Sequence, residues 1–128
     1  MNTDPSDCPF CNPDRELLLE DEYCYAIYDL YPVNEGHVLV IPKSHEDDFF
    51  LLDPVFEEHC WAMVHKVQEL LDVRFKPDGY NVGVNVGVAG GQTIGHVHIH
   101  VIPRYSGDVE DPVGGVRNVI PGKGSYRK

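Results

Sequence analysis

Three histidines stand at alternate positions in the segment GQTIGHVHIHVIPRY: they are His96, His98 and His100. Imidazole is the side chain best suited to nucleophilic attack, proton transfer or metal binding near neutral pH. If the segment is a β-strand, its side chains alternate between two faces, so the three imidazoles share one face and the apolar residues between them share the other. Such histidines could share one metal ion, or they could surround one reacting group in a pocket.

A pair of cysteines near the amino terminus, Cys8 and Cys11 in CPFC, forms a second group of chemical interest. In a reducing compartment, a CxxC pair more often binds metal or does redox chemistry than forms a structural disulfide. No thioredoxin-like βαβ pattern follows this pair, which favours metal binding. Cys24 and Cys60 lie instead in the apolar patterns of a strand and a helix, which predicts two buried thiols.

The length and the charge of the chain narrow the classes of function. A chain of 128 residues is long enough for one compact core. Its formal net charge of −11, with no basic stripe to oppose it, disfavours nucleic acid as a partner. No apolar run approaches the roughly 20 residues of a membrane helix, and the acidic, polar start is unlike a secretory signal. We therefore expect a cytoplasmic protein with no membrane partner.

Hydrophobic periodicity predicts the elements that must position these residues. Five strands are expected, at about residues 16–20, 23–29, 36–42 and 79–87 and in the histidine segment. Asp53 and Pro54 predict the start of one long helix, which runs to about residue 73 with its apolar residues on one side. Because short connections favour antiparallel pairing, the expected fold is α+β, a mainly antiparallel five-stranded sheet with one long helix.

The histidine segment resembles the signature of the histidine-triad (HIT) family of nucleotide hydrolases and transferases. In that signature three histidines alternate with apolar residues, and HVHIHVI, residues 96–102, matches it at every position. Gly36 and His37 in a strand ending IPKSH, Asp29 in AIYDLYP, Asn85, and GGQT ahead of the triad are also similar to the family. The resemblance covers about residues 8–105 and looks most like the dinucleoside polyphosphate hydrolase branch.

This resemblance implies which residues react. His98 would attack the α-phosphorus of a nucleotide and form a nucleotidyl-imidazole intermediate, which water or phosphate then resolves. His100 and Gln92 would donate hydrogen bonds to phosphate oxygens as negative charge shifts in the transition state. His37 would orient the triad from behind.

The resemblance also implies which residues bind the substrate. Asp29 would accept hydrogen bonds from the ribose hydroxyls, a role that suits a carboxylate. Thr93 and, with less support, Asn85 are expected beside the phosphates.

A structural zinc ion is implied by one branch of the family, which includes the galactose-1-phosphate uridylyltransferases. The matching ligands are Cys8, Cys11, His45 and His96, and two thiolates with two imidazoles make a closed tetrahedral set. His96 would then face zinc rather than the phosphate. A catalytic zinc ion centred on the three triad histidines is the alternative, because three protein ligands plus water make an open site.

The expected function is therefore that of a nucleotide hydrolase or transferase that cleaves at the α-phosphate, with dinucleoside polyphosphates as substrates. An adenosine phosphoramidase and a non-catalytic nucleotide-binding module are the alternatives. The resemblance further implies a two-fold homodimer that joins its sheets across the subunits. Residues 1–105 are expected to form the catalytic domain. Residues 106–128 are expected to form a Gly/Pro-rich tail that does not extend the core as regular structure and that is either mobile or packed on a partner subunit.

Overall fold

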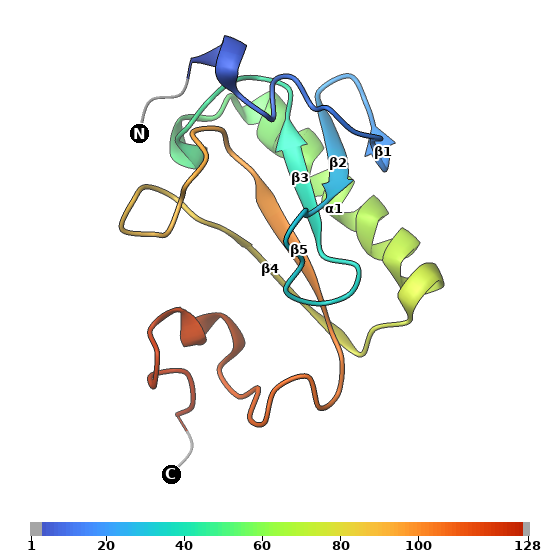
Figure 1. The fold of residues 1–128 in the computed structure, drawn as a ribbon, viewed down its shortest axis with the longest axis vertical. Helices are drawn as coiled ribbons and strands as arrows, with labels where there is room; N and C mark the ends of the chain where they lie inside the picture. The colour runs from blue at the N-terminus through green and yellow to red at the C-terminus, as the bar shows by residue number, and fades with distance from the viewer. Residues whose placement is uncertain (1–3, 127–128) are drawn as a thin grey trace.

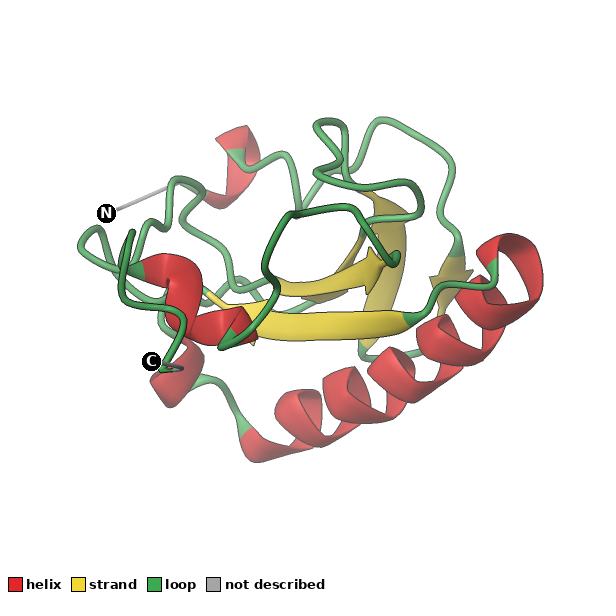
Figure 2. Ribbon diagram, turned by 90° about the horizontal axis from the view of Figure 1, so that it is seen from below, coloured by secondary structure: helices red, strands yellow, loops and turns green. Residues whose placement is uncertain are grey.

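The protein is built from a sheet and a helix that form two layers (Figure 1, Figure 2). The computed structural model describes residues 4–126, in which five strands follow the order β1-β2-β3-β5-β4 and all neighbouring strands are antiparallel. The strands are β1 Leu19–Glu20, β2 Cys24–Tyr28, β3 Val38–Pro42, β4 Gly79–Val84 and β5 Ile99–Arg104. The helix α1, Pro54–Phe75, lies along one face of the sheet, and loops cover the other face (Figure 2). The predicted α+β fold is confirmed.

The helix α1 begins at the predicted signal. The Asp53 side chain accepts a hydrogen bond from the backbone N–H of Val55 at 2.9 Å, and Pro54 occupies the first turn, where its missing N–H costs nothing. The residues that the helix buries are Cys60, Met63, Val64, Val67 and Leu71. They pack against the inner residues of the strands and form the main hydrophobic core. Within residues 4–126, no helix is both long enough and apolar enough to cross a membrane.

A second, smaller core lies on the opposite face of the sheet. Strand alternation places Tyr25 and Ile27 on this face, while their neighbours Cys24 and Ala26 face the helix. Phe10, which is 5% exposed, packs on this second face, and its carbonyl oxygen accepts a hydrogen bond from the Tyr25 hydroxyl. The amino-terminal segment is thereby fixed on the face of the sheet that is not covered by α1.

The histidine segment forms less regular strand than predicted. Strand β5 begins at Ile99, so His96 and His98 lie in an irregular segment ahead of it. The backbone N–H of Val97 donates at 2.7 Å to the carbonyl oxygen of Glu46, which lies in the loop after β3. This N–H group therefore takes no part in the hydrogen bonding between β3 and β5. Strand β4 likewise ends at Val84 rather than at residue 87.

A glycine directly before His37 is required by close packing. Gly36 has a φ of +87°, a left-handed conformation that favours glycine. A Cβ atom there would also lie 2.9 Å from the ring of Phe75 and 3.2 Å from Pro103. The end of α1 therefore packs against the turn that delivers His37 to the start of β3.

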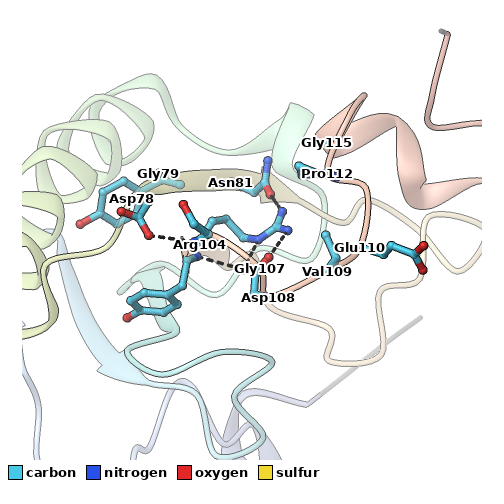
Figure 3. Close-up of a pocket in the computed structure, with 13 residues that line it drawn as sticks. Asp78, Gly79, Asn81, Arg104, Gly107, Asp108, Val109, Glu110, Pro112 and Gly115 are labelled. Atoms are coloured by element: carbon cyan, nitrogen blue, oxygen red, sulfur yellow. Dashed lines mark hydrogen bonds and ion pairs between the residues drawn. The ribbon is translucent and has the colours of Figure 1, made fainter.

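The tail packs on its own chain. Arg104 at the end of β5 donates from Nε and Nη2 to the Asp108 carboxylate, both at 2.8 Å, and from Nη1 to the Asn81 side chain (Figure 3). The Arg104 guanidinium holds the pKa of Asp108 well below its usual value. Beyond this ion pair, the 3₁₀ helix Gly115–Val119 contacts β4. This short helix buries none of its residues, so it does not extend the hydrophobic core.

Candidate active site and metal centre

A cavity of about 710 Å³ opens on the face of the sheet opposite α1. It contains most of the predicted catalytic and substrate-binding residues: His37, His98, His100, Asp29, Asn85 and Thr93. The four predicted metal ligands, Cys8, Cys11, His45 and His96, form a separate cluster. Gln92 belongs to neither group.

His98 is held by its backbone neighbour in one tautomer. Its Nδ1 lies 2.8 Å from the carbonyl oxygen of His96, and because a carbonyl can only accept, Nδ1 carries the proton. The other ring nitrogen, Nε2, therefore keeps a lone pair. Burial lowers the pKa of His98, although the bond to the His96 carbonyl and the charge of Asp29 act in the opposite direction. At neutral pH His98 is an uncharged imidazole that can act as a nucleophile.

The tautomers of His37 and His100 follow from a chain of hydrogen bonds that starts at the backbone. The N–H of Val33 donates to Nδ1 of His37 at 3.2 Å, so His37 carries its proton on Nε2. That Nε2 lies 3.0 Å from Nδ1 of His100 and 3.5 Å from Oδ2 of Asp29. His100 therefore accepts at Nδ1 and carries its own proton on Nε2.

In this tautomer, the Nε2–H group of His100 is a hydrogen-bond donor without a partner. Within the described residues, His100 Nε2 is the buried side-chain polar atom that makes no hydrogen bond. A buried N–H is normally satisfied, so an unsatisfied one beside a cavity is a group to which a ligand oxygen could bind. The rings of His98 and His100 lie 5.2 Å apart between centroids. The cavity thus holds a nucleophilic lone pair and a hydrogen-bond donor side by side.

Burial keeps this cluster uncharged. It lowers the pKa of His100 to about 4, and the neighbouring His98 and His37 contribute in the same direction. Burial also lowers the pKa of His37, against the opposing charge of Asp29. Neutral imidazoles are required for the chain of donors and acceptors described above, because a charged imidazole has no acceptor.

The predicted substrate-binding residues lie along the rim of the cavity. Asp29 follows the end of β2, and its Oδ1 accepts a hydrogen bond from the Tyr31 backbone N–H at 2.9 Å. Asn85 and Thr93 come from the loop between β4 and β5, and both side chains are exposed. All three predicted residues are accessible to a ligand in the cavity.

Gln92 does not occupy its predicted position, and its expected role needs correction. Its side-chain NH₂ group donates to the carbonyl oxygens of Asp47 at 2.8 Å and Ile94 at 3.0 Å, and its side-chain oxygen accepts from the N–H of Gly87 at 2.9 Å. Gln92 is 5% exposed and does not line the cavity. Both amide hydrogens already have backbone partners, so Gln92 braces the β4–β5 loop and has no donor left for phosphate.

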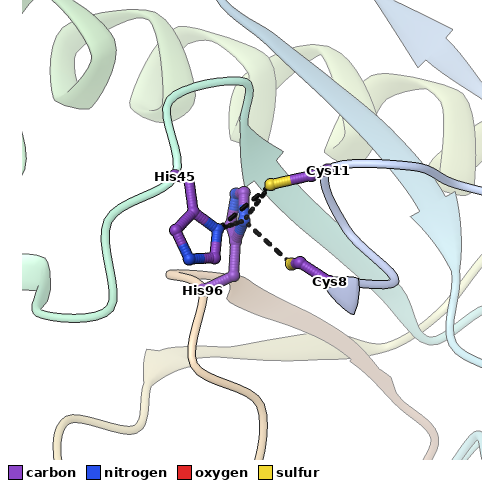
Figure 4. A group of neighbouring side chains, drawn as sticks. All are labelled: Cys8, Cys11, His45 and His96. Carbon is purple, nitrogen blue, oxygen red and sulfur yellow. Dashed lines mark hydrogen bonds between the residues drawn. The ribbon is translucent and has the colours of Figure 1, made fainter. Parts of the chain in front are cut away.

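The cysteines and histidines of the second cluster converge on one point (Figure 4). The ligand atoms of Cys8, Cys11, His45 and His96 all lie within 4.8 Å of one another. His96 Nδ1 is 3.4 Å from the Cys8 sulfur, 3.5 Å from the Cys11 sulfur and 3.2 Å from His45 Nδ1. The His45 Nδ1 to Cys11 sulfur distance is 3.0 Å. In a tetrahedral site with ordinary zinc bond lengths, nitrogens are about 3.3 Å apart and nitrogen and sulfur about 3.6 Å apart.

The donor set of this cluster fits a metal ion. His96 Nε2 donates to the Pro42 carbonyl oxygen at 2.7 Å, which fixes the tautomer and leaves Nδ1 with the lone pair that a metal needs. Burial and the neighbouring Cys8 raise the pKa of Cys11 to about 11, so two thiolates here require a compensating cation. The four residues therefore form a metal site with the composition of a closed, structural centre.

A second group, Asp29, His37 and His100, also has ligand atoms within 4.8 Å of one another. A metal bound at His37 Nε2 would require the proton to move to Nδ1, which would then face the Val33 N–H donor. Two donors would oppose each other at 3.2 Å. The backbone therefore favours the proton-sharing arrangement over metal binding at this group. Among residues 4–126, the three triad histidines do not form a convergent group of their own, because His96 belongs to the cysteine cluster.

Sequence reasoning did not single out two residues that line the cavity, Phe10 and Arg15. Phe10 packs edge-on against His98, with ring centroids 5.1 Å apart. The signal that could have found them is the CPFC motif itself. If its cysteines bind a metal together with His96, then Phe10 between the cysteines and Arg15, which follows them closely, must lie near the triad.

Comparisons with known proteins show the family to which the chain is similar. The HIT domain model matches residues 12–107. An uncharacterized HIT-like protein of Methanocaldococcus jannaschii is 39% identical over 107 residues, which cover 81% of each chain. The AP-4-A phosphorylase of Mycobacterium tuberculosis is 36% identical over 108 residues, 82% of this chain and 55% of that enzyme.

The similarity extends to solved structures that share the fold. A Zn-bound histidine triad family protein from Mycobacterium smegmatis superposes with a TM-score of 0.74 at 30% identity, over 98% of this chain and 84% of that one. The fold and the histidine-lined cavity define a histidine-triad domain. The chain belongs to the HIT family, which confirms the resemblance seen in the sequence.

Proposed function

We propose that the protein is a nucleotidyl hydrolase or transferase that cleaves at the α-phosphate through a nucleotidyl-histidine intermediate. The observation that carries this proposal is the pairing of two tautomers. His98 presents a lone pair because its Nδ1 is bonded to a backbone carbonyl, and His100 presents an N–H because its Nδ1 is bonded to His37. Neither arrangement depends on the substrate, so the site is preorganised for attack and charge stabilisation.

In the proposed reaction, His98 Nε2 forms a bond to the α-phosphorus while the bond from phosphorus to the bridging oxygen breaks. The leaving phosphate chain departs with the electron pair of that bond. The positive charge that develops on His98 is stabilised by the Nδ1–H bond to the His96 carbonyl oxygen, 2.8 Å away. His100 Nε2–H donates to a non-bridging phosphate oxygen. Water or phosphate then attacks the phosphorus from the side that the leaving group has vacated. The bond between phosphorus and His98 Nε2 breaks, which releases the nucleotide and restores His98.

Asp29, Asn85 and Thr93 would bind the rest of the nucleotide. Asp29 is suited to the ribose hydroxyls because its carboxylate only accepts hydrogen bonds and lies at the rim of the cavity. Thr93 and Asn85 would contact the phosphates from the β4–β5 loop. Gln92 would act indirectly, by holding that loop through its bonds to Gly87, Asp47 and Ile94.

Dinucleoside polyphosphates are the proposed substrates. The support is the similarity to AP-4-A phosphorylase, together with the segment GQT...HVHIHVIPR. An adenosine phosphoramidase would use the same His98 with a different leaving group. A panel of diadenosine tri- and tetraphosphate and adenosine phosphoramidate, each with and without phosphate, tests the leaving group and the acceptor. Faster turnover of the phosphoramidate than of both polyphosphates would overturn this choice.

The enzyme proposal is tested by trapping the intermediate. The protein is mixed with diadenosine tetraphosphate, quenched with denaturant at short times and examined by intact and peptide mass spectrometry. One adenylyl group is expected on the peptide that contains His98, and His98→Ala should lose both the label and turnover. His65→Ala is the matched control, because His65 is an exposed histidine on α1. Saturable nucleotide binding with neither label nor turnover would favour the non-catalytic module.

Zinc is the metal we propose for Cys8, Cys11, His45 and His96. Two sulfur and two nitrogen ligands in a closed tetrahedral set suit zinc, and the Zn-bound relative supports the choice. When bound, zinc would tie the amino-terminal segment to the segment that carries His98, and it would take no part in the reaction. Because the cysteines must stay reduced, we propose a cytoplasmic location. Metal analysis of a preparation made without chelators is expected to give one zinc ion per chain.

We also propose a two-fold homodimer and retain the division between residues 1–105 and the tail. Strand β4 stands at the edge of the sheet, where its outer backbone groups could pair with another chain. The HIT domain match ends at residue 107, close to the proposed boundary. Sedimentation analysis is expected to give twice the mass of one chain, and a monomer at all concentrations would overturn the dimer.

A further inference from the structure

Arg15 is the one lysine or arginine among the residues that line the catalytic cavity. It is half-buried, and its Nη1 donates to the Tyr28 carbonyl oxygen at 2.7 Å. Within the described residues, it forms no ion pair with a carboxylate. A guanidinium has five N–H donors, so this hydrogen bond uses one and leaves the planar fork available to a ligand.

The order of the strands places Arg15 at the end of the cavity away from the phosphate site. His100 lies on β5, His37 precedes β3, and Asp29 follows β2. Arg15 bonds to the last residue of β2, so it lies beyond that strand. With neighbouring strands about 4.8 Å apart, Arg15 is roughly 14 Å from the line of β5. A nucleotide that puts its phosphate on the triad and its ribose on Asp29 would direct its base toward Arg15.

Two charged side chains, Asp14 and Arg15, line the end of the cavity where the base would bind. Asp14 lines the cavity beside Arg15 and offers a carboxylate, which can only accept hydrogen bonds when ionised. Guanine presents two acceptors, O6 and N7, on one edge, and an arginine fork pairs with both of them. Its neighbouring edge carries the N1–H and N2–H donors that a carboxylate can bind. Adenine presents an amino donor where guanine has O6, and this donor would oppose the arginine donors.

We propose that Arg15, with Asp14, makes the site select guanine over adenine. This inference rests on the proposed nucleotide site, and it names the base that the site prefers. A bidentate arginine–guanine pair discriminates against the wrong base by about tenfold to a hundredfold. The substrates would then be guanine nucleotides, with diguanosine polyphosphates preferred to diadenosine polyphosphates.

Equilibrium binding of mononucleotides tests the preference without requiring turnover. Titration calorimetry of the full chain with GMP, IMP and AMP is expected to show GMP and IMP bound at least about tenfold more tightly than AMP, because inosine keeps O6, N7 and N1–H. Arg15→Met should remove this preference by weakening the binding of GMP and IMP at least about tenfold more than the binding of AMP. Arg15→Lys keeps the charge but not the fork, so it too should lose most of the preference.

Lys43→Gln is the matched control for net charge. Lys43 is a partly exposed lysine that pairs with Glu20 and does not line the cavity, so its loss should change neither affinity nor preference. Because Arg15 also bonds to Tyr28, melting temperatures must show that the Arg15 variants remain folded. An equal loss of GMP and AMP affinity in Arg15→Met, restored by Arg15→Lys, would mean that Arg15 acts by charge alone and would overturn the inference. Equal binding of GMP and AMP by the wild-type protein would also overturn it.

Turnover separates this inference from the proposed function. If GMP is preferred through Arg15 while no dinucleoside polyphosphate is cleaved, the proposed activity fails and the base preference stands. If diguanosine and diadenosine tetraphosphate are cleaved at equal kcat/KM, the activity stands and the base preference fails.

Discussion

The hydrogen bond from His37 to His100 provides the sharpest test of the site. His37 Nε2 lies 3.0 Å from His100 Nδ1, and this bond fixes the proton of His100 on Nε2, which would donate to a phosphate oxygen in the proposed reaction. The substitution His37→Leu removes the Nε2–H donor and replaces the imidazole with a side chain of similar volume. His100 is then free to carry its proton on the wrong nitrogen, and its buried Nδ1 loses its partner.

Two known costs set limits on the loss of kcat that we expect for His37→Leu. Leaving a buried acceptor unsatisfied costs about 1–3 kcal/mol, which corresponds to a rate effect of about 5- to 150-fold. Removing the phosphate donor altogether, as in His100→Ala, typically costs about 10²–10³-fold in kcat. We therefore expect His37→Leu to lower kcat by about 10- to 100-fold, less than His100→Ala does.

A double-mutant cycle decides whether His37 acts through His100. Single-turnover rates with saturating diadenosine or diguanosine tetraphosphate are measured for the wild-type protein, both single variants and the double variant. If His37 works only by fixing the His100 tautomer, His37→Leu should have little further effect once His100 is alanine. Effects that multiply in the double variant would refute the reasoning, and so would a His37→Leu protein with unchanged kcat. Melting temperatures confirm that the variants are folded.

Three further predictions concern stability. Because burial lowers the pKa of His100 to about 4 in the folded protein, against about 6.5 for an unperturbed histidine, this side chain binds more protons in the unfolded chain between these pH values. The contribution of His100 to the free energy of unfolding should therefore fall as pH drops from about 6.5 to about 4, by at most about 3 kcal/mol, and urea denaturation of His100→Gln should show a smaller fall than that of the wild-type protein. Gln92→Met leaves three backbone groups without their partner and should cost about 2–4 kcal/mol in urea denaturation, with lowered kcat; unchanged stability would contradict the bracing role. Cys11→Ser or chelation should release zinc and lower the melting temperature, whereas Cys24→Ser, which changes a cysteine of the main core, should retain zinc.

Much of the fold could be predicted from local patterns. The start of α1 follows from Asp53 and Pro54, whose capping geometry is set by residues adjacent in sequence. The inward and outward alternation of β2 follows from strand geometry alone. The limits of β4 and β5 could not be predicted, because partners distant in sequence, such as the Glu46 carbonyl that binds Val97, decide where a ladder ends.

The candidate site also has features that the sequence predicted and features that it did not. The sequence by itself brought out the histidines, the CPFC pair and Asp29, because their types and spacing carry a chemical signature. Only the tertiary structure decided how each one is used. The Gln92 amide is bound by Asp47 and Ile94, the His100 tautomer is set by a chain that begins at Val33, and Arg15 reaches the cavity from a segment with no motif of its own. The His98 tautomer is set locally by the His96 carbonyl oxygen. For Gln92 and His100, the partners Asp47 and His37 are remote in sequence, so the sequence around each residue does not show which of its atoms remain free.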